Sequence, residues 1–169
     1  MTRFMLALAL LSTGCGYHIS GQGDLLPKTI KTIAIPGFRN NTNRYQLARL
    51  IPTDMTHEFI TRTKYQIVGD PAQADAVLEG TLLSFVAYPT VTDPASGRAT
   101  GAQVIVSLAV TFTERATGKV LYSNTGMEYR ERYQISTNPQ EYFDESGTAI
   151  QRVAQDVSQS VVTAILEKF

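Results

Sequence analysis

The residues best suited to acid–base or metal chemistry are few and scattered. The chain of 169 residues holds two histidines, His18 and His57, and one cysteine, Cys15. His57 falls between Met55 and Phe59, off a repeating apolar stripe, where a solvated helix residue is expected rather than a base. No histidine–glutamate metal motif, cysteine pair or phosphate-cradling glycine loop supplies a metal or nucleotide site. The sequence therefore predicts no enzyme, no metal and no cofactor.

The carboxylates of the predicted strands are weak candidates for acid–base chemistry. Glu79, Glu128 and Glu131 lie in stretches that are predicted to be strands. Carboxylates on the polar face of a strand are usually solvated, and none of these is paired with a histidine in the sequence. We expect them to be surface residues and not general acids or bases.

Arginine suggests a different chemistry, the binding of phosphate, because its guanidinium offers paired donors. Arg130 and Arg132 alternate on one predicted strand and so project from the same face, about 7 Å apart at the backbone. Arg98 lies in the loop before the preceding strand. The alternative for each arginine is an ion pair with Glu128 or Glu131 at an exposed edge. Both interpretations stay open.

Cys15 follows a segment that is typical of export. Arg3 precedes an unbroken apolar run, residues 4–11 (FMLALALL), and small residues follow it. The run is too short to span a bilayer, which takes about 20 residues, but it matches a secretory signal. The alternative is a core element that begins the chain. Residues 11–15 (LSTGC) resemble a bacterial lipoprotein signal, and this resemblance implies that Cys15 carries fatty acyl chains such as palmitate.

Processing at Cys15 would divide the chain into three parts. Removal of residues 1–14 from the 169-residue chain leaves 155 residues and takes away Arg3. The 15 basic and 15 acidic residues thus become 14 and 15, a net charge of −1. Such a balance favours no nucleic-acid partner. We predict a signal peptide at 1–14, a lipidated linker at 15–28 and a single domain at 29–169.

Apolar periodicity predicts the main strands of that domain. Alternation is clearest in the third strand, where every second residue from Val104 to Phe112 is apolar. Thr117 and Gly118 then form a tight connection, so the last two strands are expected to be a hairpin. The predicted strands cover residues 30–36, 76–88, about 103–113 and 119–133, with a short piece at 64–68.

Two amphipathic helices complete the domain. The first follows the turn at 40–43, and Pro52 inside its stripe predicts a kink or a restart near Ile51. The second begins at residues 138–141 (NPQE), a capping-box sequence, and continues to the C-terminus. The apolar stripes are Leu47, Ile51, Met55 and Phe59 in the first helix, and Ile150, Val153, Val157, Val161 and Ala164 in the second.

Helices with one apolar stripe need a surface to cover, and a sheet with one apolar face provides it. The expected fold class is therefore α+β: a two-layer sandwich with two helices packed on one face of a mostly antiparallel four-stranded sheet.

At this point the chain resembles a known family over residues 15–169. The resemblance rests on the Cys-Gly-Tyr sequence at 15–17, on LLPKTIKTIAIPGFRNNT at 25–42, on QIVGDPAQADAVLEGTL at 66–82 and on the element order. These segments are similar to LptE, the lipopolysaccharide-assembly lipoproteins of the Gram-negative outer membrane. The resemblance implies lipid anchoring in the outer membrane, with the domain on the periplasmic side or inside the lumen of a partner barrel. That partner is the large β-barrel LptD, which the lipoprotein plugs while lipopolysaccharide is inserted into the outer leaflet.

Two other classes stay open. One is a membrane-anchored periplasmic adaptor for another envelope machine, such as a secretion pore or a cell-wall synthase activator. The other is a lipid carrier that works without a barrel, which would need a closed apolar cavity. The partner that co-purifies distinguishes these classes from an LptE-like protein.

Overall fold

A computed structural model describes residues 26–135 and 142–168 of the chain. The predicted signal peptide, Cys15 and the predicted helix start at 138–141 lie outside the described residues. Within them, the elements in chain order are β1 (Thr32–Ala34), β2 (Arg39–Asn40), α2 (Tyr45–Arg62), β3 (Gln66–Val68), the short 3₁₀ helix η1 (Pro71–Gln73), β4 (Ala76–Thr92), β5 (Ala99–Glu114), β6 (Val120–Gln134) and α3 (Tyr142–Leu166).

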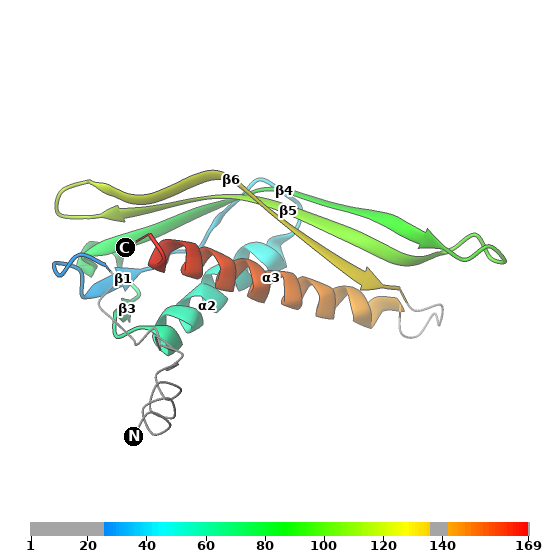
Figure 1. The fold of residues 1–169 in the computed structure, drawn as a ribbon, viewed down its shortest axis with the longest axis horizontal. Coiled ribbons are helices and arrows are strands. Elements are labelled where there is room, and N and C mark those ends of the chain that lie inside the picture. Colours follow the sequence, from blue (N-terminus) through cyan, green and yellow to red (C-terminus); the bar gives the residue numbers. More distant parts are fainter. Residues whose placement is uncertain (1–25, 136–141, 169) are drawn as a thin grey trace, which may run out of the picture.

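The elements form two layers. Figure 1 shows the long strands β4, β5 and β6 as one layer, with α2 and α3 lying side by side against the same side of it. The predicted α+β sandwich with two helices is confirmed.

The sheet itself differs from the prediction. It has six strands in the order β3-β1-β4-β5-β6, with β2 also paired to β4. β1 is parallel to β3 and β4, and β2 is parallel to β4, so the sheet is mixed. The predicted four-stranded, mostly antiparallel sheet is therefore wrong. The predicted strand at 30–36 and the predicted short piece at 64–68 are present as β1 and β3, whereas the two-residue β2 is too short for apolar alternation to reveal it. The α2 crossover makes β1 and β3 parallel.

The remaining pairings are two long antiparallel hairpins. β4 pairs with β5 from Ala76↔Glu114 to Thr92↔Ala99, and β5 pairs with β6. The predicted hairpin between the last two strands is confirmed, and Gly118 adopts a positive φ of 69° in its turn, a conformation that glycine adopts without steric cost. The far end of the β4–β5 hairpin extends past both helices (Figure 1).

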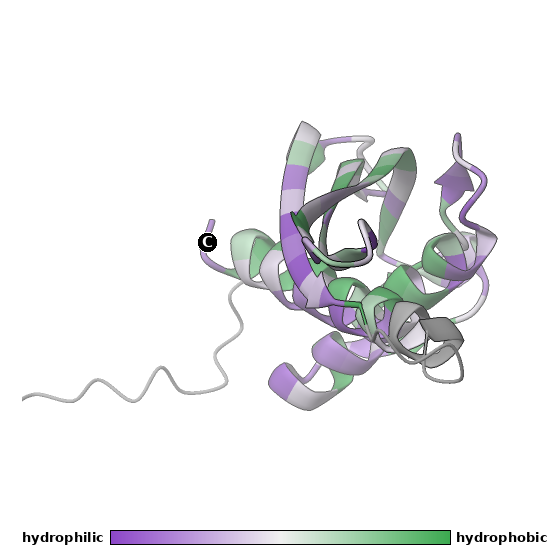
Figure 2. Cartoon of the chain, turned by 90° about the vertical axis from the view of Figure 1, so that its right-hand side faces the viewer, coloured by the Kyte–Doolittle hydropathy of each residue, from purple (hydrophilic) through white to green (hydrophobic). Residues whose placement is uncertain are grey.

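The core lies between the layers. Every second residue of β5 from Val104 to Phe112 is at most 2% exposed, which confirms the predicted apolar face. Their neighbours, Gln103, Ser107 and Thr111, project from the outer face of the sheet. Figure 2 shows the resulting bands of hydrophilic and hydrophobic residues along the strands.

The helices bury the stripes that the sequence predicts. Leu47, Ile51, Met55 and Phe59 of α2 are fully buried. α2 runs through Pro52 as one helix, without the predicted restart. In α3 the stripe is confirmed at its three valines, whereas Ala164 is partly exposed and Ile165 takes the buried position at the C-terminal end. The three valines are Val153, Val157 and Val161.

Packing begins at the first described residue. Leu26 is buried, and its backbone N–H donates to the Tyr65 hydroxyl at 2.9 Å. Leu26 lies at the end of the predicted linker, so the chain is tied to the core eleven residues after Cys15.

Candidate functional site

The outer face of the sheet carries the arginines that the sequence singles out. Arg130 is paired across the strands with Ile105, and Arg132 with Gln103. These partners alternate with the buried residues of β5, so both arginines project away from the helices. Both are exposed. The structure thus brings Arg130 and Arg132 together on one face, as their spacing predicts.

Arg130 and Arg132 differ in whether a glutamate lies beside them. The Oε2 atom of Glu128 lies 3.1 Å from the Nη2 atom of Arg130, and both side chains are more than half exposed. Glu131 is paired with the buried Val104 and so belongs to the helix-facing side of the sheet. The alternative of a surface ion pair therefore holds for Glu128 with Arg130. Among the described residues, no carboxylate lies within ion-pair distance of Arg132.

Arg98 lies apart from this pair. It sits in the turn of the β4–β5 hairpin, where its carbonyl accepts the N–H of Asp93 at 2.8 Å. Gln103, the residue paired with Arg132, is five residues after Arg98, which corresponds to roughly 16 Å along an extended strand. Arg98 is exposed at the hairpin tip.

Tyr88 lies on the same outer face of the sheet as Arg130 and Arg132, and the sequence does not predict this. Its hydroxyl donates to Oε1 of Gln103 at 2.6 Å. The register of β4 and β5 shifts by one residue between Leu82 and Ser84. Without this bulge, Tyr88 would be opposite Ala102 on the buried face, because a shift of one residue turns every later side chain to the other side.

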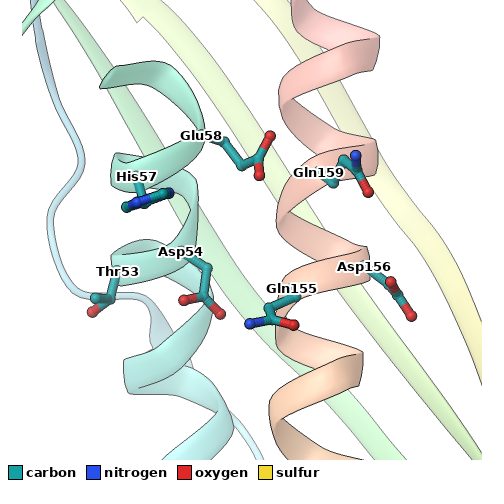
Figure 3. A pocket seen from close by; sticks show the side chains of 7 residues that line it. All are labelled: Thr53, Asp54, His57, Glu58, Gln155, Asp156 and Gln159. Atoms are coloured by element: carbon teal, nitrogen blue, oxygen red, sulfur yellow. The ribbon is translucent and has the colours of Figure 1, made fainter. Parts of the chain in front are cut away.

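A polar hollow between α2 and α3 is the other candidate. Its volume is ≈ 520 Å³. Figure 3 shows Asp54 and Gln155 pointing toward one another across it, whereas His57 turns away from α3. Partial burial raises the pKa of Asp54, nearby His57 opposes this rise and Glu58 adds to it. The lining residues are Thr53, Asp54, His57, Glu58, Gln155, Asp156 and Gln159.

Polar and titratable side chains from both helices line this hollow. A general base must lie within hydrogen-bond reach of its partner, and in the described part of the chain no side-chain hydrogen bond joins His57 to a carboxylate. Within residues 26–135 and 147–168, no group of three or more His, Cys, Asp or Glu side chains could hold a metal ion. The hollow lies in the seam between α2 and α3.

Neither helix of the described residues is both long enough and apolar enough to cross a bilayer.

Comparison with solved structures shows where this fold occurs. The PelC dodecamer of Paraburkholderia phytofirmans superposes with a TM-score of 0.57 at 16% identity, over 86% of this chain and 93% of that one. An uncharacterized lipoprotein B of Nitrosomonas europaea gives a TM-score of 0.51 at 13% identity, over 83% and 81% of the two chains. A protein XCC0632 of Xanthomonas campestris gives 0.55 at 9% identity, over 88% and 90%. At these identities the similarity concerns the fold alone.

Sequence comparison is more specific. No curated protein sequence matches the chain at a significant level. The profile of the family LptE, described as "Lipopolysaccharide-assembly", matches residues 30–165. The match runs from two residues before β1 to one residue before the end of α3 and thus covers nearly the whole described domain. The chain therefore belongs to the LptE family of lipopolysaccharide-assembly lipoproteins.

Proposed function

We propose that this protein is an outer-membrane lipoprotein that plugs and supports the barrel LptD and assists the insertion of lipopolysaccharide into the outer leaflet. The observation that carries the proposal is the family match over residues 30–165. It is supported by the two-layer α+β domain that this match covers.

The attachment to the membrane follows from the N-terminal sequence. Residues 1–14 would be removed as the signal peptide, and Cys15 would become the lipidated first residue. A single acyl chain holds a protein to a bilayer only marginally, so stable anchoring needs more than one. Residues 15–28 would link the lipid to the domain at 29–169.

Contact with lipopolysaccharide is assigned to the outer sheet face. Phosphates of that lipid need donors, and a chain of net charge −1 can supply positive charge only locally. Arg130 and Arg132 are exposed on one face, and Arg98 is exposed at the hairpin tip. These three arginines are the proposed lipopolysaccharide contacts.

Affinity purification tests the partner. The full chain with a C-terminal tag is expressed in its own bacterium, outer membranes are dissolved in a mild detergent, and the proteins that co-purify are identified. We expect one large outer-membrane β-barrel in an amount close to that of the tagged chain. An unrelated tagged lipoprotein of the same membrane is the control.

Two results would contradict the proposal. One is recovery of the tagged chain without any barrel. The other is recovery of a different envelope assembly, which would instead support an anchored periplasmic adaptor.

A further inference from the structure

Three residues on neighbouring strands form one transverse row on the outer face of the sheet. Tyr88 of β4 is paired with Gln103 of β5, and Gln103 is paired with Arg132 of β6. Directly paired residues of antiparallel strands project to the same side with their Cβ atoms about 5 Å apart. The three side chains therefore share one small area of surface, which we call the donor row.

Hydrogen bonding gives this row its polarity. The Tyr88 hydroxyl donates to Oε1 of Gln103 at 2.6 Å, so the amide uses its acceptor within the row. Both hydrogens on the Gln103 nitrogen remain, and among the described residues nothing accepts them. The guanidinium of Arg132 beside them has donors and no acceptor. Gln103 and Arg132 thus present donors to the solvent.

The next row along the sheet is different. It consists of Val86, Ile105 and Arg130. Val86 is 50% exposed, and the Arg130 guanidinium is 3.1 Å from the carboxylate of Glu128. This row offers an apolar wall and an arginine whose charge is partly neutralised. The two arginines, equivalent in the sequence, are not equivalent on the surface.

We propose that Gln103 and Arg132, with the Gln103 amide oriented by Tyr88, bind a phosphate group on a sugar, and that Glu128 weakens the contribution of Arg130. Amide and guanidinium donors side by side suit phosphate oxygens, and the apolar side chains of Val86 and Ile105 suit the face of the attached sugar. The inference rests on the proposed function, because the phosphorylated sugar it names is the headgroup of lipopolysaccharide. Tyr88 is a positioning residue, and Gln103 and Arg132 are binding residues.

Binding of purified lipopolysaccharide to the full chain in detergent tests the row, with isothermal titration at low salt. Arg132→Gln and Gln103→Glu should each weaken binding by roughly fivefold to tenfold, the range expected for a charge-assisted hydrogen bond at an exposed site. Tyr88→Phe, which keeps the ring and removes the donor, should weaken it about twofold to threefold. Glu128→Gln should strengthen it.

Matched controls separate the row from general charge effects. Arg39→Gln removes the same charge from exposed β2, beside Glu79 and Thr81 on the same side of the sheet, and should leave affinity unchanged. Lipopolysaccharide stripped of its phosphates should bind the parent and Arg132→Gln equally. Near-ultraviolet circular dichroism checks that each variant is folded.

The outcomes are distinct. If the parent binds lipopolysaccharide while Arg132→Gln and Gln103→Glu bind it as tightly, the donor row is wrong and the proposed function stands. If Arg39→Gln loses as much affinity as Arg132→Gln, the effect is net charge and the row is again wrong. Displacement of the lipid by millimolar inorganic phosphate would assign the row to free phosphate. If the parent chain binds no lipopolysaccharide, the donor row is not a lipopolysaccharide contact.

Discussion

Arg130 and Arg132 have the same charge and lie two residues apart, yet their surroundings differ. Glu128 projects to the same face as Arg130 and forms an ion pair with it, while Arg132 lies beside an amide. Strand periodicity predicts that both arginines share a face. It does not say which cross-strand neighbours they meet, because these depend on the register of three strands, which shifts at Leu82/Ser84 between β4 and β5 and at Leu108/Val110 between β5 and β6.

Asp75 has a structural role that the sequence does not reveal, because it lies in a stretch that reads as an ordinary loop. Its carboxylate accepts the backbone N–H groups of Lys31 and Thr32, both at 2.9 Å, and the Thr32 hydroxyl at 3.0 Å. These bonds tie the start of β4 to β1. They also lower the pKa of Asp75, with the Lys31 N–H the largest cause and the Thr32 N–H next.

A lowered pKa makes a pH-dependent contribution to stability. The bonds of Asp75 stabilise the fold fully above the pKa of the unfolded chain, about 3.9, and this contribution is lost as the pH falls through the lower pKa of the folded state. Asp75→Ala should therefore reduce the free energy of unfolding at pH 7, and its difference from the parent should shrink below about pH 4. Urea unfolding from pH 7 to pH 3 measures this difference. Asp156→Ala, which removes an exposed carboxylate of α3, controls for the loss of one charge. If the difference in unfolding free energy between the parent and Asp75→Ala stays constant with pH, the stabilising role of the ionised Asp75 is wrong.

Among the elements, β5 is the one that the sequence determines best. Its alternation extends over five apolar residues, long enough to identify the strand and its buried face. β2 has two residues and pairs through backbone groups, so no side-chain pattern reveals it, whereas the three-residue β3 falls within the short piece predicted at 64–68. The apolar stripe predicts α2, but the sequence alone does not show that the helix continues through Pro52 or that it packs against α3.

The buried face of β5 gives a stability prediction. Leu108 is fully buried between the sheet and the helices, so Leu108→Ala removes apolar contacts and leaves a cavity. We expect a loss of roughly 2–5 kcal/mol in the free energy of unfolding. Ser107→Ala, on the outer face of the same strand, is the control and should change it by less than about 0.5 kcal/mol. Equal effects of the two substitutions in urea melts would place Leu108 outside the core.

At the scale of the whole molecule, the function depends on where the domain is held. Fold class, element order and family could be predicted from the sequence, because long strands and helices dominate the two layers. The mixed sheet could not, since it depends on the crossover through α2. The attachment at Cys15 stays a prediction based on the N-terminal sequence.

Cys15→Ala tests this attachment. The described domain is packed from Leu26 onward, so we expect it to fold without the lipid. Expressed in excess over its barrel partner, the variant should therefore move from the membrane fraction to the soluble periplasm, because acyl chains would hold the unbound chain to the bilayer. Fractionation followed by salt and carbonate washes measures the distribution, with the parent chain as control. A variant that still sediments with membranes after these washes would show that Cys15 is not the anchor.

The central claim is that this protein acts in lipopolysaccharide assembly, and surface lipopolysaccharide measures it most directly. In the bacterium that encodes the chain, the protein is depleted, and newly made lipopolysaccharide at the cell surface is quantified by labelling with a reagent that does not cross the outer membrane. We predict that the labelled fraction falls as the protein is depleted, while total lipopolysaccharide is maintained, and that expression of the parent chain restores it. Surface lipopolysaccharide that stays at its normal level after complete depletion would contradict the account.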